Sequence, residues 1–546
     1  MNLMNNAVIN TPFPMNEPVL NYAPGSPEKE ALKTALAEVA GKEVEIPLVI
    51  GGERVKTGRL GDCVMPHDHQ HVLGRYHKAG PTEVQQAIDA AVAAQAHWQS
   101  FRWEERAAIF LKAAELLAVK YRALMNAGSM LNGGKTVFQA EIDASCELID
   151  FLRFNVAYAQ QIYENQPESS PGVWNFVQYR PLEGFVFAVT PFNFTAIAGN
   201  LPTAPAIMGN TVVWKPASSL VYTPWLFMQI LEEAGLPPGV INFVPGSGGD
   251  VGDTALASPH LAGVHFTGST RVFQQMWQTI GGNIQRYHSY PRIVGETGGK
   301  DFVFAHASAE VPVLVTALVR GSFEYQGQKC SAASRAYVPR SLWPEVKASL
   351  ESEIAKISMG PPTDFRNFVG AVIDRGAFDS IKEYLDYTRE TAGAEIIIGG
   401  GCDDSVGYYI EPTVILAEDP KFRTMVEEIF GPVLTVHVYD DEAYEETLEL
   451  CDSSSMYALT GAVIANDRSA ASLAIAKLEH AAGNFYINDK PTGAVVGQQP
   501  FGGGRASGTN DKAGSAANLM RWVSTRTIKE TFVPPTSFGY PFMGEE

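Results

Sequence analysis

A cysteine flanked by small and polar residues is the sharpest chemical signal in this 546-residue chain. Cys330 lies in FEYQGQKCSAASR, residues 323–335, just after a turn expected at Gly327. A thiolate nucleophile needs small neighbours so that a carbonyl carbon can approach it, and it needs donors or a helix N-terminus to lower its pKa. An isolated cysteine is by default a buried structural residue, so this segment alone leaves both interpretations open.

Two other segments carry groups that a thiol nucleophile would need. Glu296 follows an apolar run and precedes Gly298 and Gly299, which would leave the carboxylate room to move. A mobile glutamate can activate water as a general base. Asn193, in TPFNFTA, could present its amide to a developing oxyanion. Taken singly, each of these residues is also common in an ordinary polar turn.

Three further segments suit a dinucleotide. Lys215 ends an apolar run, and a lysine at the carboxyl end of a parallel strand suits a ribose or a phosphate. Gly268 and Ser269 lead from an expected strand into a helix, whose N-terminus would face an anion such as pyrophosphate, although the segment is not the usual GxGxxG fingerprint. Glu428 could bind ribose hydroxyls and Phe430 could support a nicotinamide ring. Each segment can equally be a solvated lysine or a turn.

The cluster of His67, Asp68, His69 and His71 resembles a set of metal ligands. It falls in an expected turn between strands, and no second ligand cluster accompanies it. We therefore expect surface polar residues and no metal. The five cysteines are widely spaced without a CxxC pair, which indicates free thiols in a reducing compartment.

The bulk composition is that of a globular protein with more than one domain, since 546 residues exceed what one core holds. A formal net charge of -19 repels nucleic acid and anionic membranes, so neither is an expected partner. The N-terminus has neither a signal-peptide nor a transit-peptide pattern. No apolar run is long enough to span a bilayer. We therefore expect a cytoplasmic protein.

Apolar patterning indicates two α/β blocks. Helices are expected from Pro81 and from Trp103. Strands and helices then alternate, which indicates βαβ units and a doubly wound, parallel nucleotide-binding sheet, and a second alternating block follows Glu296. The expected strands are 184–189, 211–215, 240–244 and 263–266 in the first block and 302–305, 336–338, 432–438, 461–465 and 484–487 in the second, with helices over 196–208 and 224–234.

Two segments fall outside these blocks. Residues 1–35 carry several Asn and Pro residues and little periodicity, which indicates an extended arm over the surface. Residues 168–182 contain an alternating pattern that predicts a protruding hairpin. An exposed strand edge of that kind is often paired with another subunit.

The motifs PFNF, KPA, FTGS, ETGGK, GQKC and EEIFGP, in this order, resemble the aldehyde dehydrogenase superfamily from about residue 40 to the C-terminus. The resemblance implies an α/β fold with a Rossmann-like NAD-binding domain, an α/β catalytic domain and a small oligomerisation hairpin and tail. It implies Cys330 as nucleophile, Glu296 as general base and Asn193 as oxyanion donor. The implied NAD-binding residues are Thr190, Lys215, Ser218, Gly268, Ser269, Glu428 and Phe430.

One residue departs from the pattern of that superfamily. Ser218 stands where many NAD-preferring members carry a glutamate that binds the adenine ribose, which weakens the case for strict NAD specificity. The implied domains are an arm over 1–35, an NAD-binding domain over 36–165 and 183–295, a catalytic domain over 296–510, and oligomerisation elements over 166–182 and 511–546.

The segment VVGQQPFGGGRASGTNDKAG, residues 495–514, narrows the resemblance to the delta-1-pyrroline-5-carboxylate dehydrogenases. Members of that family oxidise glutamate γ-semialdehyde to glutamate in proline catabolism. The implied substrate contacts are Glu147 near the amino end, Phe194 and Phe501 around the aliphatic stem, and Ser331 with the backbone of Gly493 and Ala494 at the α-carboxylate. An acid, two rings and a set of donors match the chemistry of an amino-acid semialdehyde.

Two alternatives stay open at this point. Another semialdehyde dehydrogenase, such as a succinic semialdehyde enzyme, would prefer a substrate without the amino group. A non-catalytic relative would be expected to lose the nucleophile or the base, and this chain keeps both. As partners we expect a small-molecule substrate and further copies of the chain, in a dimer or a dimer-based assembly. A transient contact with proline dehydrogenase is a further hypothesis.

Overall fold

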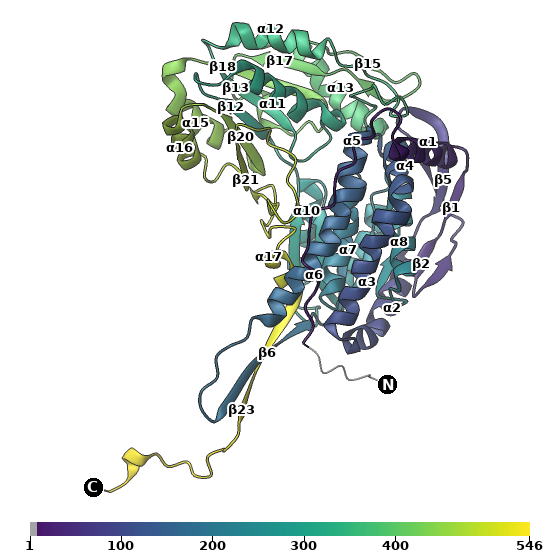
Figure 1. The fold of residues 1–546 in the computed structure, drawn as a ribbon, viewed down its shortest axis with the longest axis vertical. Coiled ribbons are helices and arrows are strands. Elements are labelled where there is room, and N and C mark those ends of the chain that lie inside the picture. The colour runs from purple at the N-terminus through teal and green to yellow at the C-terminus, as the bar shows by residue number, and fades with distance from the viewer. Residues whose placement is uncertain (1–7, 546) are drawn as a thin grey trace.

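The structure, a computed structural model, describes residues 8–545, which contain two seven-stranded sheets and a long two-stranded ribbon (Figure 1). The first sheet has the order β11-β10-β7-β8-β9-β2-β3 and is parallel from β11 to β9. Its strands are β2 (Leu48–Ile50), β3 (Glu53–Val55), β7 (Phe185–Val189), β8 (Thr211–Lys215), β9 (Ile241–Phe243), β10 (Leu261–Thr267) and β11 (Arg292–Glu296).

Helices cover both faces of this sheet because its strands bury side chains on both sides. Phe185 and Phe187 of β7 belong to one hydrophobic cluster, and Val186 and Ala188 belong to another on the opposite face. The first face packs against α2 (Pro81–Ser100), α9 (Gly248–Ala257) and α10 (Thr270–Gly282). The second packs against α3 (Trp103–Leu116), α4 (Arg122–Gly133), α6 (Leu148–Glu164), α7 (Thr195–Ile207) and α8 (Tyr222–Ala234).

The strand order reverses beside β7. The chain steps outward from β7 to β8 and β9, and then returns to place β10 and β11 on the other side of β7. Such a reversal leaves a crevice at the carboxyl ends of the strands, where doubly wound folds bind nucleotides. The predicted parallel, doubly wound sheet is confirmed.

The second sheet has the order β14-β17-β18-β13-β12-β20-β21, with only the edge strand β14 antiparallel. Its strands are β12 (Asp301–Ala305), β13 (Ala333–Pro339), β14 (Ala394–Ile398), β17 (Thr413–Ala417), β18 (Val433–Tyr439), β20 (Thr460–Ile464) and β21 (Asn484–Ile487). The helices beside it include α11 (Val311–Phe323), α12 (Trp343–Ile354), α13 (Arg375–Glu390), α15 (Tyr444–Ser453) and α16 (Arg468–Lys477). The second α/β block predicted from the sequence is therefore present.

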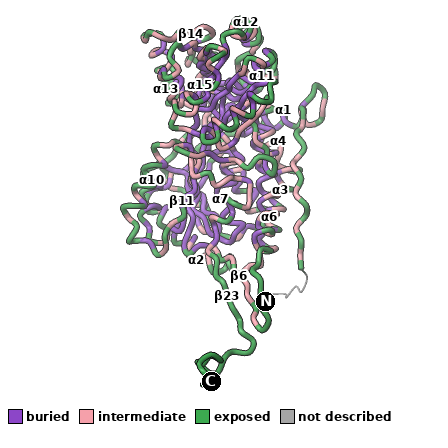
Figure 2. The backbone as a smooth tube through the Cα atoms, turned by 90° about the vertical axis from the view of Figure 1, so that its left-hand side faces the viewer, coloured by how far each residue is buried: buried purple, intermediate pink, exposed green. Residues whose placement is uncertain are grey.

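The ribbon consists of β6 (Val173–Pro181) and β23 (Val523–Thr531), which pair antiparallel from Val173↔Thr531 to Val523↔Pro181. The predicted hairpin within residues 168–182 is therefore wrong. An alternating pattern identifies a strand but not its partner, which here is the C-terminal segment. Figure 2 shows that the tail and most of β23 are exposed, whereas β6 is mostly of intermediate burial.

The predicted arm over residues 1–35 is too long. Helix α1 (Pro27–Ala40) begins inside it, where Ser26 caps the helix by accepting a hydrogen bond from the Lys29 backbone N–H (3.3 Å). Leu32, Leu36 and Val39 supply the buried face of the helix. Residues 8–22 form no regular element, as an arm should, and residues 1–7 lie outside the described part of the chain.

The predicted turn between strands is present at Pro66 and His67, between β4 (Leu60–Met65) and β5 (Asp68–His77), but the histidines are not all surface residues of this turn. His67 is buried, and strand β5 begins directly after it, beside β4 and β1 (Val44–Ile46). His69 and His71 contact different carbonyls, Asp404 O at 3.0 Å and Ala40 O at 2.9 Å. Within residues 8–545, no group of three or more His, Cys, Asp or Glu residues is arranged to hold a metal, and no helix is long and apolar enough to cross a membrane.

Trp522 fixes the root of the ribbon, and its loss should destabilise the whole chain. Its side chain is fully buried against His265, and its carbonyl accepts a hydrogen bond from Asn210 Nδ2 (2.8 Å). We expect Trp522→Ala to lower the free energy of unfolding by about 3–5 kcal/mol, because it leaves a large cavity. The measurement is urea unfolding. Trp277→Ala, at a tryptophan that is half exposed, is the control and should change stability by about 0.5 kcal/mol or less. Equal effects of the two substitutions would contradict this assignment.

Candidate active site

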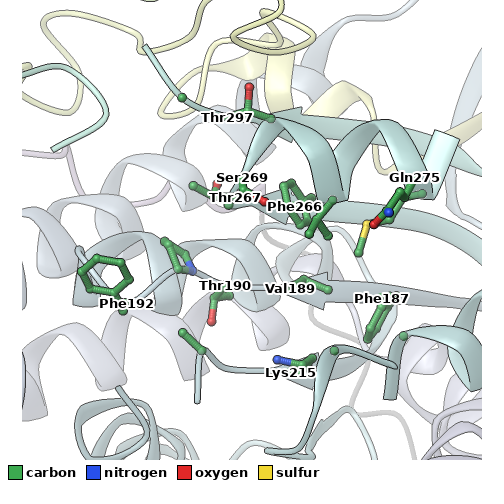
Figure 3. Close-up of a pocket in the computed structure, with 18 of the residues that line it drawn as sticks. Phe187, Val189, Thr190, Phe192, Lys215, Phe266, Thr267, Ser269, Gln275 and Thr297 are labelled. Atoms are coloured by element: carbon green, nitrogen blue, oxygen red, sulfur yellow. The ribbon is translucent and has the colours of Figure 1, made fainter. Parts of the chain in front are cut away.

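A cavity of about 660 Å³ lies where the two sheets meet (Figure 3). The first sheet contributes residues at the carboxyl ends of its strands, including Thr190, Lys215 and Ser269. The second sheet contributes residues just ahead of its strands, including Cys330 before β13 and Glu428 before β18. The cavity size falls in the range of ordinary cofactor and ligand sites.

An unusual turn places Cys330 in this cavity. Three consecutive residues before it have left-handed backbone angles: Tyr325 (φ 53), Gln326 (φ 55) and Gly327 (φ 65). The two non-glycine residues are strained in this conformation and need their surroundings to hold them. Tyr325 donates its hydroxyl to Gly133 O (3.0 Å), and the Gln326 amide donates to two backbone carbonyls at 2.9 and 2.8 Å. The turn is thus held by the end of α4 and by the segment at Ala371.

The surroundings of Cys330 favour its neutral form. Burial raises the pKa of the thiol well above its usual value, and the carboxylates of Asp301, Glu428 and Glu296 raise it further. The Cys330 backbone N–H opposes this rise, but Cys330 leads into strand β13 and does not stand at a helix N-terminus. The thiol therefore keeps its proton at neutral pH in this arrangement, and forming the thiolate requires a proton acceptor.

Asn193 is buried in the wall of the same cavity. Its Nδ2 donates to Gln328 O (3.1 Å), two residues before Cys330. This bond uses one N–H of the amide and fixes its orientation. The second N–H remains for a ligand atom next to the thiol.

A buried ion pair that sequence reasoning missed fixes the loop around Asn193. Asp143, in the π-helical segment η2 (Glu141–Glu147), accepts hydrogen bonds from the backbone N–H groups of Thr195 (3.0 Å) and Ala196 (2.9 Å). It also pairs with Lys135 Nζ at 2.6 Å, and that ammonium lies 4.2 Å from the centre of the Phe194 ring. Asp143 thus binds the free N–H groups at the start of α7. Only contacts between distant residues reveal this role.

Glu296 ends β11 but turns away from the cavity. Its Oε2 accepts a hydrogen bond from Gly503 N (3.0 Å), and burial raises its pKa well above the usual value. The Lys512 ammonium opposes this rise. Glu296 is not among the residues lining the cavity, whereas Thr297 and Gly298 are. A rotation of its side chain is needed to bring the carboxylate to the Cys330 side.

The predicted dinucleotide residues converge, with one exception. Lys215 is buried, and burial lowers the pKa of its ammonium to about 8. Among residues 8–545 this ammonium has one hydrogen-bond acceptor, Pro216 O at 3.2 Å. A buried ammonium with spare donors fits a ligand rich in hydroxyl and phosphate oxygens. Ser218 does not line the cavity and donates to Gly246 O (3.3 Å), while Ala217 takes the lining position.

The far wall of the cavity carries an acid and two rings. Glu428 accepts a hydrogen bond from Gly299 N (2.9 Å), and burial raises its pKa to about 7. The rings of Phe430 and Phe192 meet edge to face with their centroids 5.8 Å apart. Gly268 and Ser269 stand at the N-terminus of α10, which opens on the same cavity. These groups suit the ribose, the planar ring and the phosphates of a dinucleotide, respectively.

The six predicted substrate residues lie outside the lining of this cavity. Ser331 connects the cavity with the predicted substrate residues. It directly follows Cys330, and its Oγ donates a hydrogen bond to Thr492 Oγ1 (2.9 Å), the residue before Gly493. Gly493 has a left-handed φ of 100° and is exposed, so its backbone N–H is free of a crowding side chain.

Phe501 exchanges backbone hydrogen bonds with Ala513. Glu147, at the end of η2, is partly buried, and burial with its acidic neighbours raises its pKa to about 8.

Comparison with known proteins agrees with this arrangement. The sequence model of the Aldehyde dehydrogenase family matches residues 55–528. This chain belongs to the aldehyde dehydrogenase family. A mitochondrial delta-1-pyrroline-5-carboxylate dehydrogenase from Dictyostelium discoideum is 54% identical over 537 residues, which are 98% of this chain and 96% of the relative. The corresponding mitochondrial protein of Mus musculus is 49% identical and covers 97% of this chain and 94% of its own length.

Among solved structures of this aldehyde dehydrogenase family, that of the Delta-pyrroline-5-carboxylate dehydrogenase from Mycobacterium tuberculosis is similar to this one. Its TM-score is 0.96 at 55% identity, with 99% of this chain and 100% of that chain covered. The same protein has been solved bound with NAD.

The prediction of a cytoplasmic protein is wrong by these comparisons, because relatives of this similarity are mitochondrial by name. The lack of a transit-peptide pattern therefore does not determine the compartment.

The raised pKa of Glu147 predicts a pH-dependent stability. The folded chain holds this proton up to about pH 8, whereas the unfolded chain releases it near pH 4.5, so stability falls as pH rises through this window. We expect the free energy of unfolding of wild type to decline relative to that of Glu147→Gln by roughly 1 kcal/mol per pH unit between pH 5 and 8. Urea unfolding at several pH values measures this. Glu164→Gln, at an exposed position, is the control: its free energy of unfolding should change with pH in the same way as that of wild type. The same pH dependence in Glu147→Gln and wild type would refute the prediction.

Proposed function

We propose that this chain is an NAD-dependent dehydrogenase that oxidises L-glutamate γ-semialdehyde, formed from delta-1-pyrroline-5-carboxylate, to L-glutamate. The observation that carries the proposal is the placement of Cys330 and Asn193 in one cavity with Lys215, Glu428 and the start of α10. That combination supplies a nucleophile, an oxyanion donor and a dinucleotide site together. Relatives at about half identity over nearly the whole chain bear the corresponding name.

The first chemical step belongs to Cys330 and Asn193. The Cys330 thiol passes its proton to a water molecule, and the resulting thiolate attacks the aldehyde carbon. A carbon–sulfur bond forms, the π bond of the carbonyl group breaks, and its electron pair places negative charge on the former carbonyl oxygen. The free N–H of the Asn193 amide, oriented by Gln328 O, and the Cys330 backbone N–H donate to that oxygen. NAD, when bound, supplies the acceptor for the hydride that the tetrahedral carbon loses. The product on the enzyme is a thioester.

The second step belongs to Glu296. Its raised pKa makes the deprotonated carboxylate a strong base. After rotating from Gly503 it removes a proton from water, which attacks the thioester carbon. The carbon–sulfur bond breaks, and glutamate and the Cys330 thiolate are released.

The cofactor is held by residues from both sheets. Lys215 and Glu428 bind ribose hydroxyls, Thr190 and Phe430 flank the nicotinamide, and the turn at Gly268 and Ser269 meets the pyrophosphate. Ser218 contributes no charge beside the adenine ribose, so it neither holds the 2′-hydroxyl nor repels a phosphate there. The observed spare donors of the buried Lys215 support this arrangement.

The substrate is held by residues on the other side of Cys330. Ser331 and the backbone N–H groups of Gly493 and Ala494 bind the α-carboxylate. Phe194 and Phe501 enclose the aliphatic stem, and Glu147 lies near the ammonium. The Ser331–Thr492 hydrogen bond supports this set, because it joins the nucleophile's neighbour to the carboxylate loop.

The proposed functional domains of the chain correspond to the two sheets. We assign NAD binding to residues 36–165 and 183–295 and catalysis to 296–510. The ribbon and the tail after residue 511 serve assembly into a dimer or a dimer-based oligomer, since they expose Trp174, Phe538 and Phe542. A transient contact with proline dehydrogenase remains a prediction.

The function is tested by NADH formation from delta-1-pyrroline-5-carboxylate. Wild type should form NADH, and Cys330→Ser should lose nearly all of that activity, because a serine hydroxyl is a far weaker nucleophile at neutral pH. Cys402→Ser is the matched control, since Cys402 is a partly exposed free thiol away from the cavity. Full activity of Cys330→Ser would overturn the proposed nucleophile. A higher kcat/KM for succinic semialdehyde than for glutamate semialdehyde would overturn the proposed substrate.

Asn193→Ala should reduce kcat much more than it changes substrate affinity. The amide acts on charge that develops only in the transition state, and one such donor contributes roughly 3–4 kcal/mol, or about 10²–10³-fold in kcat. Steady-state kinetics with both substrates measures the effect. Asn175→Ala, at an asparagine on the ribbon strand β6, is the control and should keep wild-type kcat. A normal kcat for Asn193→Ala would exclude the oxyanion role.

A further inference from the structure

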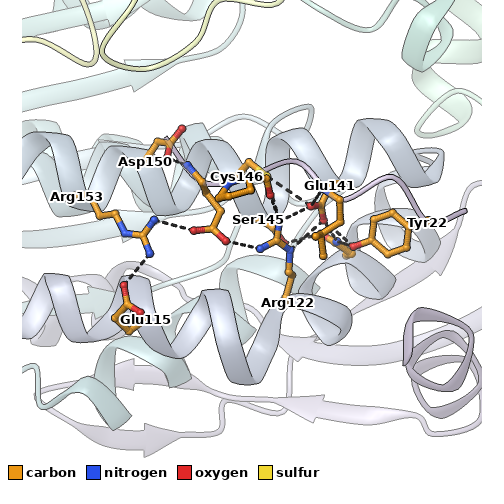
Figure 4. Close-up of polar contacts among 12 residues, drawn as sticks. Tyr22, Glu115, Arg122, Glu141, Ser145, Cys146, Asp150 and Arg153 are labelled. Carbon is orange, nitrogen blue, oxygen red and sulfur yellow. Dashed lines mark hydrogen bonds and ion pairs between the residues drawn. The ribbon is translucent and has the colours of Figure 1, made fainter. Parts of the chain in front are cut away.

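The N-terminal arm runs along α6 and ends against η2. Figure 4 shows the polar contacts there: Arg122 lies against Glu141, and Asp150 and Arg153 lie further along α6. The Tyr22 hydroxyl donates to Glu141 (2.7 Å), and Leu20 N donates to the same carboxylate (2.9 Å). The arm is thereby tied to the first residue of η2.

Glu17 ties the middle of the arm to two helices. Its backbone N–H donates to Asp150 Oδ1 (2.7 Å). Its carboxylate pairs with Arg122 of α4 at 2.5 Å and with Arg153 of α6 at 2.7 Å. All of these groups are largely shielded from water, so the contacts are stronger than surface ion pairs. The position of the residue before Glu17 is therefore well determined.

That residue, Asn16, reaches a part of the chain far away in sequence. Its amide nitrogen donates to Asp150 Oδ2 (2.8 Å) and to Val496 O (2.8 Å). Its amide oxygen accepts a hydrogen bond from Gln498 Nε2 (2.9 Å). Both N–H groups and the oxygen of one side chain are thus used to connect α6 with the loop that follows β21.

This loop has little regular structure of its own. The described backbone between residues 488 and 500 forms no helix or strand. Gly497 has a left-handed φ of 83°, and a side chain there would meet the Phe154 ring at 2.1 Å, so the loop lies directly on α6. Val496 is buried. Contacts at Val496 and Gln498 therefore determine where the preceding Gly493 and Ala494 lie.

We propose that Asn16 is a positioning residue for the substrate: it holds the 493–498 loop at the place where its backbone N–H groups bind the substrate carboxylate. The inference rests on the proposed function, which assigns the carboxylate to Gly493 and Ala494. Asn16 acts through the loop and contributes to neither the thiol chemistry nor the cofactor site. Its loss should weaken binding of substrates with an α-carboxylate and leave other aldehydes unaffected.

The test compares two aldehydes with the full-length enzyme. Asn16→Ala should raise the KM for glutamate semialdehyde about tenfold, the effect of losing one to two net hydrogen bonds. Its kcat, its KM for NAD and its kcat/KM for propanal, which has no carboxylate, should stay within about twofold of wild type. Asn10→Ala is the matched control, because Asn10 lies on the same arm and accepts from Gln160 of α6 (2.9 Å); it should match wild type with both aldehydes.

Gln498→Leu provides a second, milder variant at an exposed position, and we expect it to raise the same KM about threefold. An unchanged KM in both variants, or equal losses with both aldehydes, would overturn the inference while the proposed function stands. If wild type does not prefer glutamate semialdehyde to propanal, the proposed function fails and the inference fails with it.

Discussion

A crossing of four residues, 297–300, determines how the two halves of this enzyme face each other. The chain leaves the carboxyl end of β11 and enters the amino end of β12 within that span. The first sheet therefore presents the carboxyl ends of its strands to the cavity, and the second presents the amino ends of its strands. Lys215 and Ser269 therefore come after strands of the first sheet, whereas Cys330 and Glu428 come before strands of the second sheet.

Burial acts in opposite directions on the acids and the bases around this junction. It raises the pKa of Glu296, Glu428 and Cys330, and it lowers the pKa of Lys215. Each group is thereby moved toward its neutral form. With a pKa of about 8, the Lys215 ammonium still carries its charge at neutral pH, so it can bind the hydroxyl and phosphate oxygens of an anionic cofactor.

The sequence alone was sufficient to predict the main helices and strands and the catalytic motifs. It was not sufficient to predict which distant segments of the chain contact one another. The apolar runs of β7, β8 and β12 identify strands because every residue in them is buried or nearly so. The partner of β6, the Lys135–Asp143 pair and the contacts of Asn16 depend on chain segments that only the fold brings together. The direction of Glu296 was also not predictable, since its motif is the same whichever way the carboxylate points.

The ribbon has a consequence for the synthesis of the chain on the ribosome. Strand β6 is translated long before its partner β23, since the paired residues Arg180 and Ser524 are 344 positions apart in the sequence. Until β23 is made, both edges of β6 are unpaired, and unpaired edges invite association with other chains. The ribbon can therefore form only after the strands of both sheets have been translated, so shielding by chaperones or neighbouring nascent chains would act on β6 first.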